Sequence, residues 1–252
     1  MRLDIVIPAH NEEHRIDATL RAYRAVCSGP DVRIRVALDW CTDGTATIVA
    51  RHAAADPRVG LLEYPKLGKG GVLREAFRRC DADYVAFVDA DCATPPGELL
   101  RLVDACRHAD GAIATRRHPA SVLPRPRSLS RRMTSAGFAL CVRGLFGLTY
   151  SDTQCGAKVI RRGALQRILP LLSLRDFVFD VDLLLVARAL NLRVVEMPTI
   201  WIDKDGSRMN VLADTRRMVL SLLLLWLSHR AAPLPRATPA PAPLPTGQVV
   251  RV

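Results

Sequence analysis

The sequence predicts one α/β domain built around a mostly parallel sheet. Over about the first 115 residues, short apolar runs alternate with stretches of helical periodicity. This alternation is typical of βαβ units, in which helices cover both faces of a parallel sheet. Ligands of such sheets bind beyond the carboxyl ends of the strands. Pro8, Asp39 and Asp89 each end one of the apolar runs, so we expect them to meet at one edge of the sheet.

The strands of this first half are short apolar runs bounded by Pro, Gly or Asp. They are expected at residues 3–7, 32–38, 59–64, 84–88 and 112–115. Helices are expected at residues 11–25, 44–55 and 96–108, and from the loop 66–71 to residue 80. Asn11 is expected to cap the first helix, with Glu12 and Glu13 in its first turn, where acids complement the helix dipole.

The second half is less regular. An Arg- and Pro-rich stretch, 118–132, predicts a mobile loop, and residues 151–160 predict a turn that enters a short strand. The remaining expected elements are helices at 130–145, 180–190 and 210–230, a strand at 193–198 and a polar loop at 201–208. Residues 231–252 contain six prolines and few core-forming residues, which predicts disorder. The predicted organisation is one domain over 1–230, divided near residue 115, and a disordered tail over 231–252.

Composition narrows the class of partner. The chain of 252 residues is 49% hydrophobic and carries a formal net charge of +11. A basic protein suits an anionic partner such as a nucleic acid, a phosphorylated substrate or an acidic membrane surface, although an Arg-rich proteome would give the same balance. Because no run of five basic residues occurs and only 5% of residues are aromatic, nucleic-acid binding is disfavoured.

The cysteines and the apolar runs indicate where in the cell the protein is expected to be. Seven cysteines include no CxxC pair, which disfavours a zinc site and a disulfide framework and favours a reducing compartment. The N-terminus shows no signal-peptide pattern. The longest apolar run, 218–227, is about half as long as a membrane-spanning helix. We therefore expect a cytoplasmic protein, with peripheral contact at the inner face of the cell membrane through residues 211–230, unless that helix packs in the core.

Two acids follow the apolar run in "YVAFVDADCATPPGELL", residues 84–100. Residues i and i+2 of a strand face the same side, so Asp89 and Asp91 at its end can reach one ion. Oxygen ligands of this kind suit Mg²⁺ or Mn²⁺ shared with substrate phosphates. The alternative is a pair of turn or cap acids before two prolines.

Two further stretches point to the same edge. Asp39 ends the second strand and can accept a hydrogen bond from a nucleobase or ribose, or serve as a turn acid. Lys66 and Lys69 stand among glycines before a helix, an arrangement that suits phosphate. Neither a P-loop nor a GxGxxG pattern occurs, so the loop alone is a weak signal.

Together these stretches resemble family 2 glycosyltransferases with the GT-A fold. "IVIPAHNEE", "VALDWCTDGT", "KLGKGGVLREAF" and "VDADCATPP" resemble the opening strand, the second-strand signature, the Gly-Lys-Gly loop and the DxD of that family. "SDTQCGAKVIRR", "FVFDVDLLLVA" and "VVEMPTIWIDKDGSRMN" look like its polyprenol-phosphate hexosyltransferase branch, which includes dolichyl-phosphate glucose and mannose synthases. The resemblance covers about residues 3 to 220.

The resemblance implies transfer of a hexose, with inversion, from a UDP- or GDP-sugar to a polyprenyl phosphate. Asp89 and Asp91 would hold Mg²⁺ or Mn²⁺, which offsets the charge of the leaving nucleotide. The half 1–115 would bind the nucleotide sugar, and the half 116–230 would bind the acceptor. The expected nucleotide-sugar residues are Pro8, His10, Asn11, Glu12, Asp39, Lys66, Lys69, Gly70 and Asp89.

A phosphate acceptor is already an anion, so cations that guide it matter more than a strong base. The candidates are Arg116, Arg117, Arg131, Arg132, Gln154 and Arg208, of which Arg116 and Arg208 rank highest. A hydroxyl acceptor would instead need a base, for which Asp182 or Asp180 is the candidate unless they cap a helix.

Three other readings stay open. One is a soluble family 2 enzyme acting on a small phosphorylated or natural-product acceptor. Another is a sugar nucleotidyltransferase, which would need a Gly-rich, Arg-bearing loop where Ala9, His10 and Asn11 stand. The last is a non-catalytic sugar-nucleotide-binding protein, which the presence of Asp39, Asp89 and Asp91 disfavours.

Overall fold

A computed structural model describes residues 1–125, 129–173, 178–203, 211–231 and 234, with the side chains of 129–132, 211–217 and 231 excepted. The strands are β1 (Leu3–Ala9), β2 (Val32–Asp39), β3 (Val59–Tyr64), β4 (Tyr84–Val88), β5 (Gly111–Thr115), β6 (Ala157–Arg161) and β7 (Val194–Pro198). The helices are α1 (Ile16–Val26), α2 (Thr45–Ala55), α3 (Lys69–Arg78), α4 (Pro96–Ala105), α5 (Leu129–Phe146), α6 (Arg162–Ile168), α7 (Phe179–Ala189) and α8 (Val211–Ala231).

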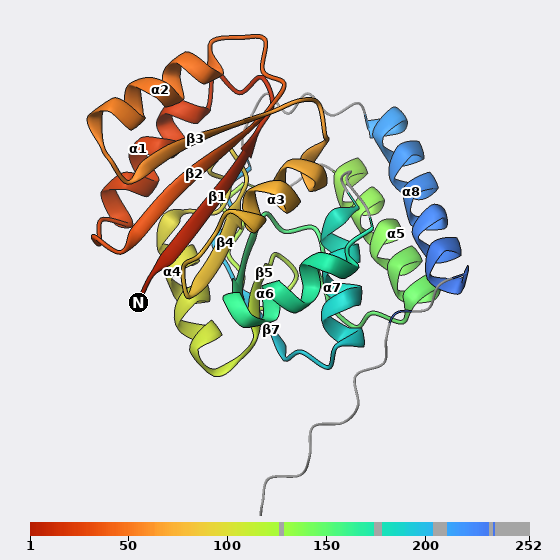
Figure 1. The fold of residues 1–252 in the computed structure, drawn as a ribbon. Helices are drawn as coiled ribbons and strands as arrows, with labels where there is room; N and C mark the ends of the chain where they lie inside the picture. The colour runs from red at the N-terminus through yellow and green to blue at the C-terminus, as the bar shows by residue number, and fades with distance from the viewer. Residues whose placement is uncertain (126–128, 174–177, 204–210, 232–233, 235–252) are drawn as a thin grey trace, which may run out of the picture.

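The strands form one sheet in the order β3-β2-β1-β4-β6-β5-β7 (Figure 1). Pairing is parallel from β3 to β4 and between β5 and β7, whereas β6 runs antiparallel to both of its neighbours, β4 and β5. This confirms the predicted α/β fold with a mostly parallel sheet. The antiparallel strand matters for function because it brings the chain after α5 back beside β4.

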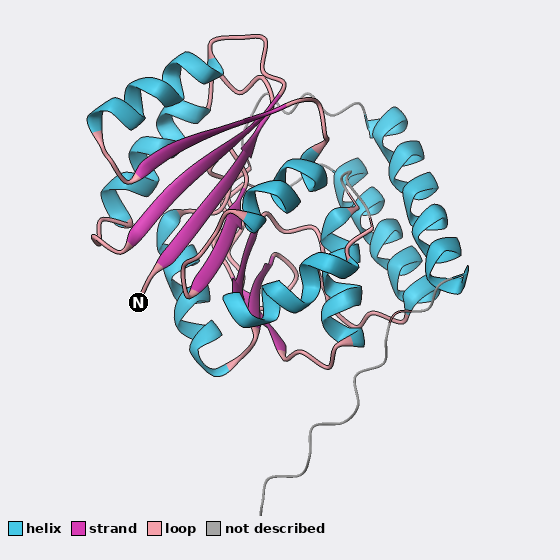
Figure 2. Ribbon diagram, viewed as in Figure 1, coloured by secondary structure: helices cyan, strands magenta, loops and turns pink. Residues whose placement is uncertain are grey.

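Helices cover both faces of the sheet, as the alternating pattern predicts. On one face α1, α2 and α4 close a core that includes Ile5, Leu20 and Leu99. On the other face α3, α6 and α7 close a second core, and α5 packs against α8 at its outer side (Figures 1 and 2). The central strand β1 is buried along most of its length because helices lie above and below it.

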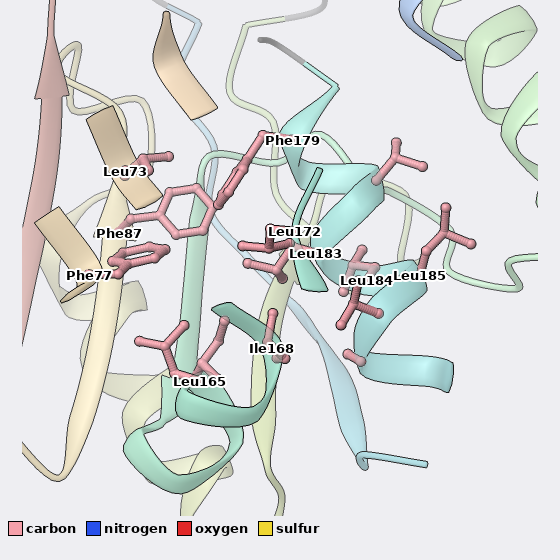
Figure 3. Close-up of a cluster of buried hydrophobic side chains, with 14 of the residues drawn as sticks. Leu73, Phe77, Phe87, Leu165, Ile168, Leu172, Phe179, Leu183, Leu184 and Leu185 are labelled. Atoms are coloured by element: carbon pink, nitrogen blue, oxygen red, sulfur yellow. The ribbon is translucent and has the colours of Figure 1, made fainter. Parts of the chain in front are cut away.

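Three phenylalanines from three different elements meet in this second core (Figure 3). The ring centroids of Phe77, on α3, and Phe87, on β4, are 5.9 Å apart. Phe179, at the start of α7, lies 6.3 Å from Phe77 and 6.4 Å from Phe87. Tilted and edge-on ring pairs at these distances add to the free energy gained from apolar burial. The cluster therefore fixes α7 against the strand that carries the acid pair.

The first helix is shorter than the sequence predicts. It begins at Ile16, with Arg15 rather than Asn11 before its first residue. Asn11 has a φ of 55° and belongs to a loop that crosses to the end of β2. The predicted cap is wrong because the Asn11 side chain bonds to Thr42, in that neighbouring loop, instead of to the helix.

Other expected elements are confirmed, most within one or two residues. The helix expected at 96–108 ends at Ala105 and continues as a short 3₁₀ turn to His108. Helix α6 was not expected from the sequence. Within the expected loop 118–132, Val122 forms an isolated β-bridge with Ile200. Residues 232, 233 and 235–252 of the expected tail lie outside the described residues, as do 126–128 of the loop 118–132 and 204–208 of the expected loop 201–208.

The aromatic cluster generates a stability prediction. Replacing Phe179 with Ala leaves a cavity between α3, β4 and α7, which is expected to lower the free energy of unfolding by about 3 to 5 kcal/mol. Urea denaturation followed by circular dichroism measures this loss. Leu220→Ala, on the exposed side of α8, is the matched control and should change stability by less than about 0.5 kcal/mol. Equal effects of the two variants would contradict the assigned core.

Candidate active site

Three strand ends place the predicted polar residues at one edge of the sheet. Pro8 pairs with Ala37, two residues before Asp39. Val6 pairs with Phe87, two residues before Asp89, so that Pro8 and Asp89 lie level on neighbouring strands. The expectation that Pro8, Asp39 and Asp89 meet at the carboxyl edge is therefore correct.

The loops after β1 and β2 are tied together. His10 Nδ1 donates to the carbonyl oxygen of Asp39 at 2.5 Å, and Thr42 N donates to Asn11 Oδ1 at 2.8 Å. Asn11 and Trp40 both adopt left-handed backbone conformations, with φ of 55° and 52°. Such conformations are costly for residues other than glycine and persist only where surrounding contacts enforce them. The loops after β1 and β2 are therefore held in fixed positions beside the carboxyl edge of the sheet.

Asp39 holds the next loop rather than facing open solvent. Its two carboxylate oxygens accept the backbone N–H groups of Leu67, at 2.7 Å, and Gly68, at 3.1 Å. Gly68 has a φ of 77°, a conformation that glycine adopts without strain. Asp39 thus positions the first turn of α3, where Lys69 begins the helix and Gly70 is buried. Lys66 lies exposed at the start of the same loop.

Asp89 and Asp91 follow β4 directly, at the mouth of the sheet. Lys69 Nζ donates to Asp89 Oδ1 at 2.7 Å. Burial and then the charge of Asp89 raise the pKa of Asp91, whose Oδ1 accepts the N–H of Ala93 at 2.9 Å. Burial also raises the pKa of Glu12, against the opposing charge of Arg15, and the charges of Asp91 and Asp89 contribute. Negative charge is therefore concentrated at this point of the site.

These acids fit a divalent ion that is shared with substrate. Among the described residues, no three His, Cys, Asp or Glu side chains gather closely enough to enclose a metal. Mg²⁺ commonly takes one or two carboxylates and completes its coordination with water and substrate phosphates. Asp89 and Asp91 would supply those carboxylates, and the mutual charge that raises the pKa of Asp91 is what a cation offsets.

Gly156 makes room for Asp89. A Cβ atom at Gly156 would lie 1.8 Å from Asp89 Oδ2, which is far inside contact distance. Gly156 precedes β6, whose first residue, Ala157, pairs with Val88 at the end of β4. The "DTQCG" stretch is thus pressed against the acid pair by the antiparallel strand. Its glycine is required by this close approach of backbone to carboxylate.

A buried ion pair lies next to Asp89. Lys158, on β6, is fully buried and donates to Asp180 Oδ1 at 2.5 Å and to the carbonyl oxygen of Cys155 at 2.8 Å. Asp180 Oδ2 lies 4.0 Å from Lys69 Nζ. Four charges therefore form a chain from the protein interior to the site, in the order Lys158, Asp180, Lys69 and Asp89. A lysine in the middle of an otherwise apolar strand is the sequence signal for such a buried partner.

Asp182 lies in different surroundings from Asp180. Its Oδ2 accepts the backbone N–H of Ser173 at 2.7 Å, and its Oδ1 lies 3.5 Å from Nε2 of His229, on α8. These contacts tie α7 to α8 and do not involve the acid pair. Of the two acids considered as a base, Asp180 is the one connected to Asp89.

Arg116 forms a buried pair with Asp152, the first acid of "DTQCG". Nε donates to Asp152 Oδ2 at 2.6 Å and Nη2 donates to Oδ1 at 2.9 Å, while the guanidinium stacks 5.2 Å from the centroid of Trp201. Burial opposes ionisation of Asp152, but Arg116 outweighs it and lowers the pKa of Asp152 to about 2. Arg116 therefore fixes the stretch that contains Gly156, a role that the sequence did not reveal.

The other residues predicted to bind the acceptor differ in their surroundings, and some of their side chains are not described. Arg117 is exposed and its Nη2 donates to the carbonyl oxygen of Ser135, on α5, at 2.6 Å. Gln154 Nε2 is buried without a hydrogen-bond acceptor among the described residues. The backbone of Arg131 and Arg132 belongs to α5, but their side chains are not described, and Arg208 lies outside the described residues.

The fold is that of the GT-A glycosyltransferases. Glucosyl-3-phosphoglycerate synthase from Mycobacterium tuberculosis, crystallised with Mn²⁺, uridine diphosphate and glucosyl-3-phosphoglycerate, superposes with a TM-score of 0.66. The match covers 90% of this chain and 80% of that one at 17% identity, and it bears on the fold alone. The model of glycosyl transferase family 2 matches residues 4–169, and the chain belongs to this family.

Relatives in this family confirm the resemblance to the polyprenol-phosphate branch. The undecaprenyl-phosphate mannosyltransferase of Micrococcus luteus is 31% identical over 81% of this chain and 85% of its own length. The dolichyl-phosphate beta-glucosyltransferase of Saccharomyces cerevisiae is 27% identical over 90% of this chain and 75% of its own. The glycosyltransferase AglD of Haloferax volcanii is 29% identical over 90% of this chain, which spans only 37% of that protein.

The contact between Gly156 and Asp89 generates a prediction. Gly156→Ala is expected to displace the Asp89 carboxylate and to lower nucleotide release from a sugar donor about 100-fold, because a shift of about 1 Å at a reacting centre has effects of that size. Gly163→Ala, on α6, is the matched control, since no atom lies within 4 Å of the added Cβ. Full activity of Gly156→Ala would show that Asp89 does not need its present position.

Proposed function

We propose that this glycosyltransferase moves a hexose from a UDP- or GDP-sugar to a polyprenyl phosphate with the help of Mg²⁺ or Mn²⁺. The observation that carries the proposal is the contact between the two halves of the site. Asp89, in the half proposed to bind the donor, touches Gly156 of "DTQCG", a stretch that resembles the polyprenol-phosphate branch. The named activities of the M. luteus and S. cerevisiae relatives support the same acceptor class.

On the donor side, Asp89 and Asp91 would hold the metal, which would supply positive charge to offset that of the leaving diphosphate. The walls of the nucleotide site are the tied loops after β1 and β2, with Pro8 near the end of β1 and His10, Asn11 and Glu12 in the loop that follows it. Asp39 fixes the loop from Lys66 to Gly70, so that Lys69 reaches toward the same point as the acids. Because these groups are held before the donor arrives, they need little reorganisation when charge develops.

On the acceptor side, a phosphate oxygen attacks the anomeric carbon and the nucleotide leaves from the opposite face. The nucleophile is already an anion, so the step needs no proton acceptor, and Asp182 instead links α7 to α8 through His229. The buried amide of Gln154 supplies a donor for the incoming phosphate. Further phosphate ligands, by the same proposal, are Arg116, Arg117, Arg131, Arg132 and Arg208.

An activity assay tests the proposal. The protein is incubated with UDP- and GDP-hexoses and Mg²⁺ or Mn²⁺, with undecaprenyl phosphate, with 3-phosphoglycerate or with no acceptor, and released nucleotide is measured. We expect release of UDP or GDP that depends on the lipid. Release that depends on 3-phosphoglycerate instead would replace the lipid by a soluble phosphorylated acceptor. Pyrophosphate release would indicate a nucleotidyltransferase.

The same assay includes Asp91→Asn, which retains an oxygen for the N–H of Ala93 and removes the negative charge. Turnover should fall at least about 100-fold while the melting temperature stays close to that of the wild type. Asp104→Asn, at an exposed acid of α4, is the control for a change of one charge. Normal turnover of Asp91→Asn would remove Asp91 from the metal site.

We propose in addition that α5 and α8 rest on an anionic membrane surface. Apolar side chains on the outer side of α8 are exposed, among them Leu220 at 58% and Leu224 at 53%, and an open apolar groove of about 340 Å³ separates the two helices. α5 and α8 contain six Arg and one Asp, three of the Arg in each helix. Apolar surface flanked by cations favours anionic lipid and disfavours a second copy with the same charge.

No helix of the described residues is long and apolar enough to cross a membrane.

Flotation with vesicles tests whether the exposed face of α5 and α8 binds a membrane surface. Binding to phosphatidylglycerol vesicles is expected, with much weaker binding to phosphatidylcholine, and Leu220→Glu with Leu224→Glu should abolish it. Val26→Glu, at an exposed apolar residue of α1, is the control. Unchanged flotation of the double variant, or a dimer that the double variant dissociates, would overturn the membrane assignment.

A further inference from the structure

Lys69 forms an ion pair with Asp89, one of the two acids proposed to bind the metal. Its Nζ lies 2.7 Å from Asp89 Oδ1, and the two side chains are 20% and 36% exposed. An ammonium group and a divalent ion repel each other strongly when both contact the same carboxylate in a partly buried site. The oxygen that Lys69 holds is therefore not available to a metal ion until Lys69 moves.

Lys69 has a second carboxylate within reach. Asp180 Oδ2 is 4.0 Å from its Nζ, and Asp180 is itself almost fully buried. Lys158 holds Asp180 in place, because Lys158 Nζ donates to Asp180 Oδ1 at 2.5 Å. Lys158 is itself fixed by its hydrogen bond to the carbonyl oxygen of Cys155. Asp180 therefore stays in place when Lys69 moves and keeps the ammonium group close to the site.

The backbone beside Lys69 is fixed as well. The two N–H groups immediately before it, at Leu67 and Gly68, are held by Asp39. Lys69 can therefore change partners by rotation of its own side chain, without a shift of α3. The side chain is long, partly exposed and directed at the point where the diphosphate is proposed to lie.

We propose that Lys69 is a displaceable counter-ion of Asp89. With no donor bound it competes with the divalent metal for Asp89, and when the donor arrives it transfers to the diphosphate and releases the carboxylate. Metal and nucleotide then bind cooperatively, because each removes the obstacle to the other. The inference rests on the proposed metal site at Asp89 and Asp91, but it makes no use of the acceptor.

Mn²⁺ binding to Lys69→Met tests the inference without any turnover. The free ion is followed by electron paramagnetic resonance during titration of the protein, first alone and then with saturating UDP. Without UDP, Lys69→Met should bind Mn²⁺ on the order of tenfold more tightly than the wild type, because the competing cation is gone. With Mn²⁺ present, the same variant should bind UDP more weakly, because the diphosphate has lost a cation.

The opposite signs of the two effects separate this role from a merely structural ion pair. In the wild type, UDP and Mn²⁺ should strengthen each other's binding by the same factor, and this factor should shrink in Lys69→Met. Lys69→Arg retains a cation and should keep Mn²⁺ affinity near that of the wild type. Arg51→Met, an equal charge change at an exposed residue of α2 outside the proposed site, should leave Mn²⁺ affinity unchanged.

Unchanged or weaker Mn²⁺ binding by a folded Lys69→Met variant in the absence of UDP would overturn the inference and leave the proposed transferase reaction standing. Circular dichroism establishes that the variant is folded, and Lys69→Gln serves as a second neutral variant that must show the same tightening. Failure of the wild type to bind Mn²⁺, with and without UDP, would overturn both the metal site and the inference. A protein that binds Mn²⁺ as expected but does not glycosylate a lipid would refute only the proposed acceptor.

Discussion

The carboxylate of Asp89 is the constraint on which the rest of the site depends. It lies where the parallel part of the sheet meets the antiparallel strand β6, and it touches elements from both halves of the chain. Gly156 bounds it on one side and Lys69 on the other. Because β6 pairs residue by residue with β4, any shift of "DTQCG" is transmitted to the acid pair. Elements from the two halves of the chain are thus held in register by the backbone hydrogen bonds between β4 and β6.

The buried pair of Lys158 and Asp180 supports this constraint at an energetic cost. Burying two charges gains little stability even with good geometry, and apolar residues of similar size often replace such pairs without loss. Lys158 is further satisfied by the carbonyl oxygen of Cys155 and lies 5.1 Å from the centroid of the Phe87 ring. A charge kept in this position is therefore better explained by the site than by stability, because it gives Asp180 a fixed negative charge next to Lys69.

The sequence predicted the sheet edge well because strands and their carboxyl ends depend on local patterns. Apolar runs placed β1 to β5, and the acids after them had to meet once the strands were parallel. It did not predict that Asp39 binds the backbone of Leu67 and Gly68, or that Asn11 bonds across to Thr42, since both contacts depend on how separate loops approach. Nor did it predict that Arg116, a candidate phosphate ligand, bonds to Asp152, because Asp152 lies 36 residues away and comes close only when β5 and β6 pair.

The charges around Asp89 also support the proposal that a metal ion and the sugar donor bind together. Four carboxylates, those of Glu12, Asp89, Asp91 and Asp180, are matched in part by three cations, Arg15, Lys69 and Lys158. The charges of a divalent ion and a nucleotide diphosphate are opposite in sign and similar in magnitude. When both bind, the net charge of the site therefore stays nearly unchanged. Either one alone would add uncompensated charge in a site where water is partly excluded, which is unfavourable. Of these three cations, Lys69 is the one for which partial exposure is combined with two carboxylates within 4.0 Å, so it can balance either imbalance.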